Sequence, residues 1–189
     1  MNGGILSVSC ASQYLLKITI QSFGVNAPIL IMLLLTFMIL RKKAVGYLAL
    51  GLEKKSAKII VLVLTIVYSL SLARQLIVYD DKATIMFKWL YYLVFVAFCE
   101  ELEYRALIPA ILKGRVHKYV EWLLPNVLFA CGHLVLLMIQ GKELTELLGI
   151  LCNTIVGYVL IGIFWEWCKR KSGSLWVSVL IHAIMDFGV

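Results

Sequence analysis

Long apolar runs separated by short polar segments dominate the chain. A transmembrane helix needs about 20 apolar residues to cross the hydrocarbon core of a bilayer. The pattern therefore predicts six membrane helices, at residues 18–40, 59–78, 84–112, 119–139, 147–167 and 175–187. The last run is short, so neighbouring helices or a thin local bilayer must support it. Residues 5–16 precede the first run, and the pattern allows them either to lie along the membrane or to cross it.

Composition agrees with a membrane protein and leaves no room for a soluble domain. The 189 residues are 62% hydrophobic with a mean hydropathy of +0.93, whereas soluble domains are closer to half apolar. The predicted fold class is an all-α, polytopic transmembrane helical bundle forming one membrane domain. Within it, we expect residues 1–83 to supply N-terminal helices and a basic loop, and residues 84–189 to form the functional core.

The net charge of +7 raises the possibility of a nucleic-acid partner, but its distribution argues against one. The basic residues stand in short clusters between apolar runs and form no stripe across a soluble fold. The loops after the first, third and fifth predicted helices carry twelve Lys or Arg residues, and the alternate loops carry two. This asymmetry places the basic loops in the cytoplasm and makes membrane lipid the expected partner.

Several ionisable side chains fall inside the predicted helices, where each costs about 2.5–3.5 kcal/mol on insertion scales. They come from three helices and are Glu100, Glu101, Arg105, His133, His182 and Asp186. At 1.5 Å per residue, Glu100, His133 and His182 lie roughly 18, 21 and 12 Å from the cytoplasmic helix ends. Similar depth favours convergence on one buried, hydrated pocket.

Spacing within the third helix separates two roles. Glu101 and Arg105 are four residues apart and can form an ion pair on one helix face. Glu100 is rotated by about 100° from Glu101 and is left without that partner. A carboxylate in a partly dry pocket binds a proton more readily than one in water, which suits a general base. The alternative is that the whole cluster is a structural network of ion pairs.

The two helical histidines each share a face with a residue four positions away. His133 follows Phe129, a candidate for the wall of a substrate pocket, and His182 precedes Asp186. A single histidine on an apolar helix is more often a core residue than a catalyst. Two at matching depth, together with Glu100, favour a catalytic site.

These residues form three ordered motifs: Glu100-Glu101-x-x-x-Arg105, Phe129-x-x-x-His133 and His182-x-x-x-Asp186. Over about residues 90–188 the chain resembles the CPBP family of CAAX proteases and bacteriocin-processing enzymes, also called Abi proteins. The resemblance implies that Glu100 activates a water with help from His133, and that His182 donates to the oxyanion. It also implies a structural role for Glu101 and Arg105, the other two residues of the first motif. For the protein as a whole, it implies a location in a bacterial cytoplasmic membrane.

Asp186 departs from the family pattern, which usually has Asn at this position. An ionised aspartate cannot donate a hydrogen bond to an oxyanion. It could instead be protonated, or it could accept a hydrogen bond from the His182 ring and orient it, as carboxylates behind metal-bound histidines do.

One glutamate and two histidines could also bind zinc with a water in the fourth position. However, the HExxH helix signature is absent, and the ligands would come from three separate helices. The resemblance favours metal-free glutamate catalysis, so we expect no cofactor, with zinc as the alternative.

Three functions are compatible with the sequence. The favoured one is an intramembrane endopeptidase acting on a membrane-associated peptide: a prenylated CAAX-type tail, a bacteriocin leader or a pheromone precursor. The second is a non-catalytic membrane immunity or binding protein on the same scaffold. The third is a small transporter, since buried Glu and His also build proton relays, but the chain lacks the inverted repeats typical of transporters.

Overall fold

The computed structural model describes residues 51–139, 141 and 143–188. The predicted helix at residues 18–40 and the segment at residues 5–16 lie outside this part of the chain. All regular elements in the described ranges are helical, and none is a strand. The predicted all-helical class is therefore confirmed there.

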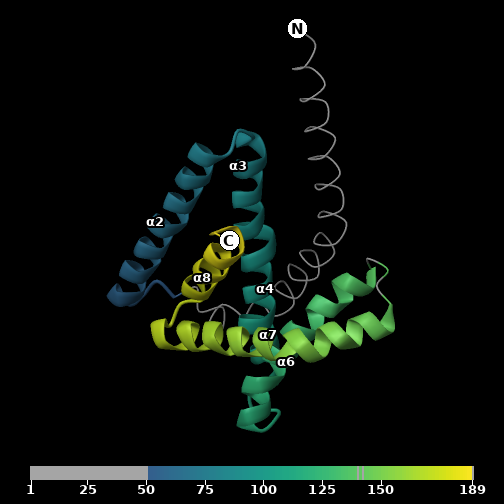
Figure 1. Cartoon of the computed structure of the whole chain (residues 1–189). Helices are drawn as coiled ribbons and strands as arrows, with labels where there is room; N and C mark the ends of the chain where they lie inside the picture. The colour runs from purple at the N-terminus through teal and green to yellow at the C-terminus, as the bar shows by residue number, and fades with distance from the viewer. Residues whose placement is uncertain (1–50, 140, 142, 189) are drawn as a thin grey trace.

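Helix α2 and a long helix that begins with α3 meet at the top of the structure and diverge below it (Figure 1). The first is α2, Lys55–Val78. After a short turn, Asp81 caps the second helix, because its Oδ1 accepts a hydrogen bond from the Thr84 amide at 3.0 Å. This second helix runs without a break through α3 (Lys82–Tyr91), η1 (Tyr92–Phe98), α4 (Cys99–Glu101), η2 (Leu102–Leu107) and α5 (Ile108–Leu112). Both long helices are apolar enough to cross a membrane.

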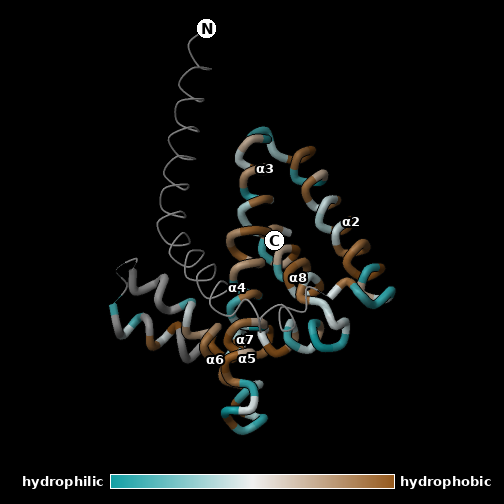
Figure 2. The backbone as a smooth tube through the Cα atoms, turned by 180° about the vertical axis from the view of Figure 1, so that it is seen from behind, coloured by the Kyte–Doolittle hydropathy of each residue, from teal (hydrophilic) through white to brown (hydrophobic). Residues whose placement is uncertain are grey.

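Three further helices complete the described fold: α6 (Lys118–Ile139), α7 (Leu144–Ser172) and α8 (Leu175–Gly188). Gly173 ends α7 in the left-handed conformation, with φ at 74°, which glycine adopts without strain. Hydrophilic residues concentrate at the turns and apolar residues along the helices (Figure 2). The helix positions follow the predicted ones, but the predicted count of six membrane spans is not confirmed, since two described helices pass the length and hydropathy criteria.

Helix α8 is the centre of the fold. Its 14 residues extend about 21 Å, too short to cross a hydrocarbon core of about 30 Å. It lies between α2 and the α3–α5 helix (Figure 1) and packs against α2, η1 and α7. Its buried residues include Leu175, Val179, His182 and Phe187. Neighbouring helices thus supply the support that its short length requires.

The α3–α5 helix departs from regular α geometry on both sides of Glu100, at η1 and η2. Single π-helical turns often occur at functional sites. Just beyond η2, Pro109 has no amide hydrogen to donate to the carbonyl of Arg105. The Lys169 ammonium of α7 donates to that carbonyl instead, which also fixes α7 against this helix.

Helices α6 and α7 pack together at Gly162 of α7. A Cβ added to Gly162 would lie 2.6 Å from Asn126 Oδ1 and 2.9 Å from Arg105 Nη2. Both of these side chains are buried, so neither can swing into solvent. The missing side chain at Gly162 therefore lets the Arg105 guanidinium fit between the two helices.

Replacing Gly162 with alanine is expected to destabilise the protein by about 1–3 kcal/mol, because the added methyl overpacks the contact with Arg105. The measurement is thermal unfolding in detergent. Gly157→Ala on the same helix is the matched control, since a Cβ added there would meet nothing within 4 Å and alanine favours a helix by about 1 kcal/mol. Equal melting temperatures for the two variants would contradict this account of the packing.

Candidate active site

The Glu101–Arg105 pair lies at the base of the site. Glu101 Oε1 and Arg105 Nη1 are 3.6 Å apart, and the side chains are 0% and 1% exposed, respectively. This is the pairing expected from their i, i+4 spacing. The guanidinium also lies 4.4 Å above the centroid of the Phe129 ring, a cation–π contact that strengthens when water is excluded.

His182 of α8 links this pair to the rest of the site. Its Nδ1 faces Glu101 Oε1 at 3.3 Å, and its Nε2 faces Asp186 Oδ2 at 3.2 Å. The imidazole stacks on Trp165 of α7, with 3.9 Å between ring centroids and 21° between planes. Both ring nitrogens and one ring face are therefore engaged, so the orientation of the imidazole is fixed by three helices.

Glu100 stands on the accessible side of His182. Its Oε2 lies 3.9 Å from His182 Nε2, and that oxygen accepts no hydrogen bond from any described residue. Its side chain is 31% exposed, whereas that of Glu101 is 0% exposed. Asp186, at 30%, is the other accessible carboxylate beside the imidazole. The adjacent carboxylates of the first motif thus differ in surroundings: Glu101 is enclosed, whereas the Glu100 side chain is partly exposed and its Oε2 atom is buried.

His133 enters the cluster from α6. Its Nδ1 hydrogen-bonds with the Phe129 carbonyl at 3.0 Å, and its ring stacks on Tyr158 with 4.1 Å between centroids. Within the described part of the chain, His133 forms no ion pair with Glu100. The imidazole beside Glu100 is that of His182, whereas the family resemblance assigns help with the water to His133.

Phe129 lies at the meeting point of the aromatic side chains. Its ring is edge-on to His133 at 4.8 Å and to His182 at 6.2 Å. The side chain is 1% exposed, which puts it beneath the two imidazoles. Its expected role in the wall of a substrate pocket stays a prediction.

Helix α7 makes a contribution that the sequence motifs do not reveal. Trp165 stacks on His182, and the neighbouring Glu166 binds Lys169 at 2.8 Å and Arg170 at 2.5 Å. Glu166 is an acid inside the predicted helix at residues 147–167, so the cost of burying charge could have identified it. No comparable signal marks Trp165, because aromatic residues are common in membrane helices.

The described residues contain no group of three or more His, Cys, Asp or Glu side chains arranged to hold a metal ion. His133 Nδ1 is bound to a backbone carbonyl, and both nitrogens of His182 face carboxylates.

Comparison with known proteins gives a match at family level. The profile of a family described as type II CAAX prenyl endopeptidase Rce1-like matches residues 82–188, more than half of the chain and all of the cluster around Glu100. No curated protein and no solved structure matches the chain. The chain belongs to the Rce1-like family of membrane-embedded CAAX prenyl endopeptidases.

Proposed function

We propose that this protein hydrolyses a peptide bond in the tail of a prenylated CAAX-type substrate, with Glu100 as the general base that activates water. The observation that supports this most directly is the 3.9 Å separation between Glu100 Oε2 and His182 Nε2. A polar separation beyond 3.5 Å suits a bridging water, and this carboxylate oxygen has no described hydrogen-bond donor. A water there would be the nucleophile.

In the proposed reaction, the water attacks the scissile carbonyl and its proton passes to Glu100. The carbonyl oxygen becomes an oxyanion, which the Nε2–H of His182 can stabilise through a hydrogen bond shared with Asp186. Collapse of the tetrahedral intermediate breaks the C–N bond, and Glu100 returns the proton to the leaving amine. The residues carry out each step without a cofactor.

The partners of His182 support its role. Glu101 accepts a hydrogen bond from the Nδ1–H of His182. The negative charge of Glu101 is compensated inside the protein by the Arg105 guanidinium. Asp186 lies where it can accept from Nε2–H. In this proposal Asp186 acts on the imidazole rather than on the oxyanion, a role that an ionised aspartate can fill at a position where the family usually has Asn.

Replacing Glu100 with glutamine is expected to lower cleavage by at least about 100-fold, the usual contribution of a general base. Glutamine preserves the size of the side chain and cannot take up the proton. The measurement is hydrolysis of a prenylated CAAX-type peptide by the purified protein in vesicles, with a bacteriocin leader and a pheromone precursor assayed in parallel.

Glu103→Gln is the matched control, because Glu103 lies on the same helix and forms no ion pair with any described residue. It should retain near-normal cleavage, as should the unmodified protein after treatment with a chelator. Equal cleavage by Glu100→Gln and the unmodified protein would exclude Glu100 as the general base. If the unmodified protein and Glu100→Gln both bind the peptide and neither cleaves it, the alternative is favoured, a membrane binding or immunity protein.

Asp186→Asn is expected to keep cleavage within about tenfold of the unmodified protein, whereas Asp186→Ala should lose more. The amide oxygen of Asn can still accept the hydrogen bond from His182 Nε2, and alanine cannot. The same vesicle assay compares the two variants. Equal loss in both would show that the negative charge of Asp186 is required, and not its hydrogen-bond acceptor.

A further inference from the structure

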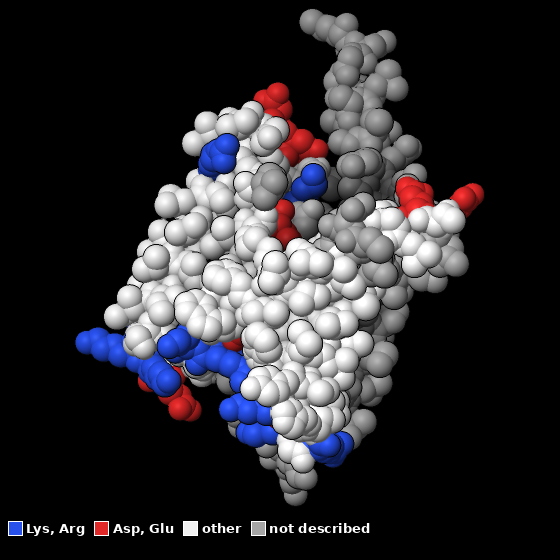
Figure 3. Space-filling view, turned by 60° about the horizontal axis from the view of Figure 1, so that its bottom comes forward, with Lys and Arg blue, Asp and Glu red and all other residues white. Residues whose placement is uncertain are grey.

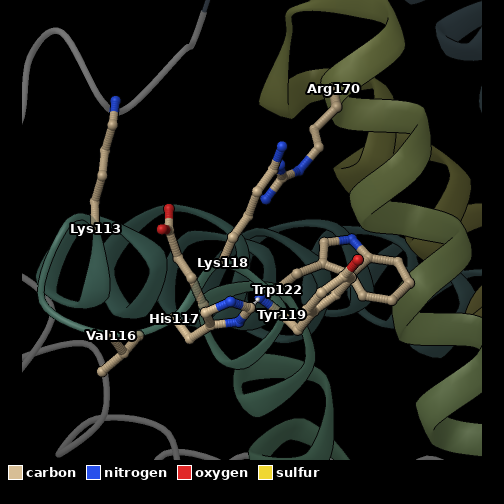
Figure 4. Close-up of a pocket in the computed structure, with 8 residues that line it drawn as sticks. Lys113, Val116, His117, Lys118, Tyr119, Trp122 and Arg170 are labelled. Atoms are coloured by element: carbon tan, nitrogen blue, oxygen red, sulfur yellow. Dashed lines mark hydrogen bonds between the residues drawn. The ribbon is translucent and has the colours of Figure 1, made fainter.

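A cavity of about 680 Å³ lies away from the catalytic cluster, at the end of the bundle where α5 leads into α6. Its walls come from the connecting turn, the first turns of α6 and the end of α7. They include Lys113, His117, Lys118, Tyr119, Trp122 and Arg170. Figure 4 shows the Lys118 and Arg170 side chains reaching into the same space from two different helices.

The walls of this cavity carry an excess of positive charge. Three permanent cations line it, against one acid, Glu121. An adjoining cavity of about 230 Å³ shares Lys113, Glu121 and Arg170 and adds Lys169 and Glu166. Because Glu166 already serves both Lys169 and Arg170, it does not neutralise the cluster. Cations held at one place repel each other unless an anion lies between them.

The residues around the cavity are of the kinds found at the ends of membrane helices. Lys and Arg gather mainly along one edge of the molecule, opposite most of the acidic residues (Figure 3). Tyr119, 76% exposed, stands at the cavity wall, with Ile111 and Leu123 exposed on the adjoining helices. Basic and aromatic side chains at the ends of membrane helices mark the membrane–water interface. A ligand there can have its charged group among the cations and its apolar part against exposed side chains.

We propose that this cavity binds the phosphate headgroup of an anionic membrane phospholipid. Basic pockets between helices on the cytoplasmic side are suited to such headgroups. The apolar surroundings favour a lipid over free phosphate, which has no acyl chains to place there. A chain of contacts connects the cavity to the candidate catalytic cluster: Arg170 shares Glu166 with Lys169, and Lys169 donates to the Arg105 carbonyl.

The test is direct binding of phosphatidylglycerol, compared with phosphatidylcholine, to the purified full chain, measured by native mass spectrometry from detergent. The unmodified protein should retain phosphatidylglycerol preferentially. Lys118→Gln should weaken that binding about fivefold, the contribution of one lysine near an anionic surface. Lys118→Arg should retain it, because the charge is preserved.

Lys171→Gln is the matched control. It removes the same charge at the same end of the bundle, but Lys171 is exposed and does not line the cavity. Equal weakening by Lys171→Gln and Lys118→Gln would show diffuse surface attraction and overturn the proposal. Equal retention of phosphatidylcholine would do the same, as would displacement of the lipid by inorganic phosphate or by an acidic peptide at comparable concentration. The readout does not depend on peptidase activity, so it is independent of the proposed function.

Discussion

The buried contact of Glu101 with Arg105 and His182 organises the described core. A carboxylate with no exposure to solvent is tolerated only when it is paired and hydrogen-bonded. Here one oxygen faces both the guanidinium at 3.6 Å and the imidazole at 3.3 Å. Because Arg105 is one turn away on the same helix and His182 lies on α8, the partners of this one charge join the long helix to the central short helix. Removing Arg105 would leave the buried charge of Glu101 uncompensated.

Around this contact, backbone irregularity in one helix is compensated by side chains of another. Pro109 leaves the Arg105 carbonyl without its helical donor, and Lys169 of α7 replaces it. The same lysine binds Glu166 at 2.8 Å. Gly162 of α7 provides the space that the Arg105 guanidinium occupies. Helix α7, which supplies none of the three family motifs, therefore holds the backbone and the side chain of Arg105 in place.

The charged side chains gather in two regions of opposite sign, one rich in carboxylates and one rich in cations. The candidate catalytic cluster carries three carboxylates near one imidazole, and the side chains of two of them are partly exposed. The end of the bundle near Arg170 carries an excess of cations, with Glu166 shared between two of them. The chain of contacts through Lys169 connects these regions. Burying the charged groups of this chain costs free energy. That cost is offset because each of them contacts a group of opposite charge or donates to a backbone carbonyl.

The sequence by itself determined the helices and the residues of the cluster. Apolar runs gave the positions of the described helices because burial depends on local composition and length, and i, i+4 spacing gave the Glu101–Arg105 and His182–Asp186 contacts because helical geometry is local. Only the tertiary structure decided that His182 Nε2 lies 3.9 Å from Glu100 Oε2, that Trp165 stacks on His182, and that Lys169 replaces the donor lost at Pro109. These depend on how separate helices are rotated and packed against each other, which no spacing within one helix can specify.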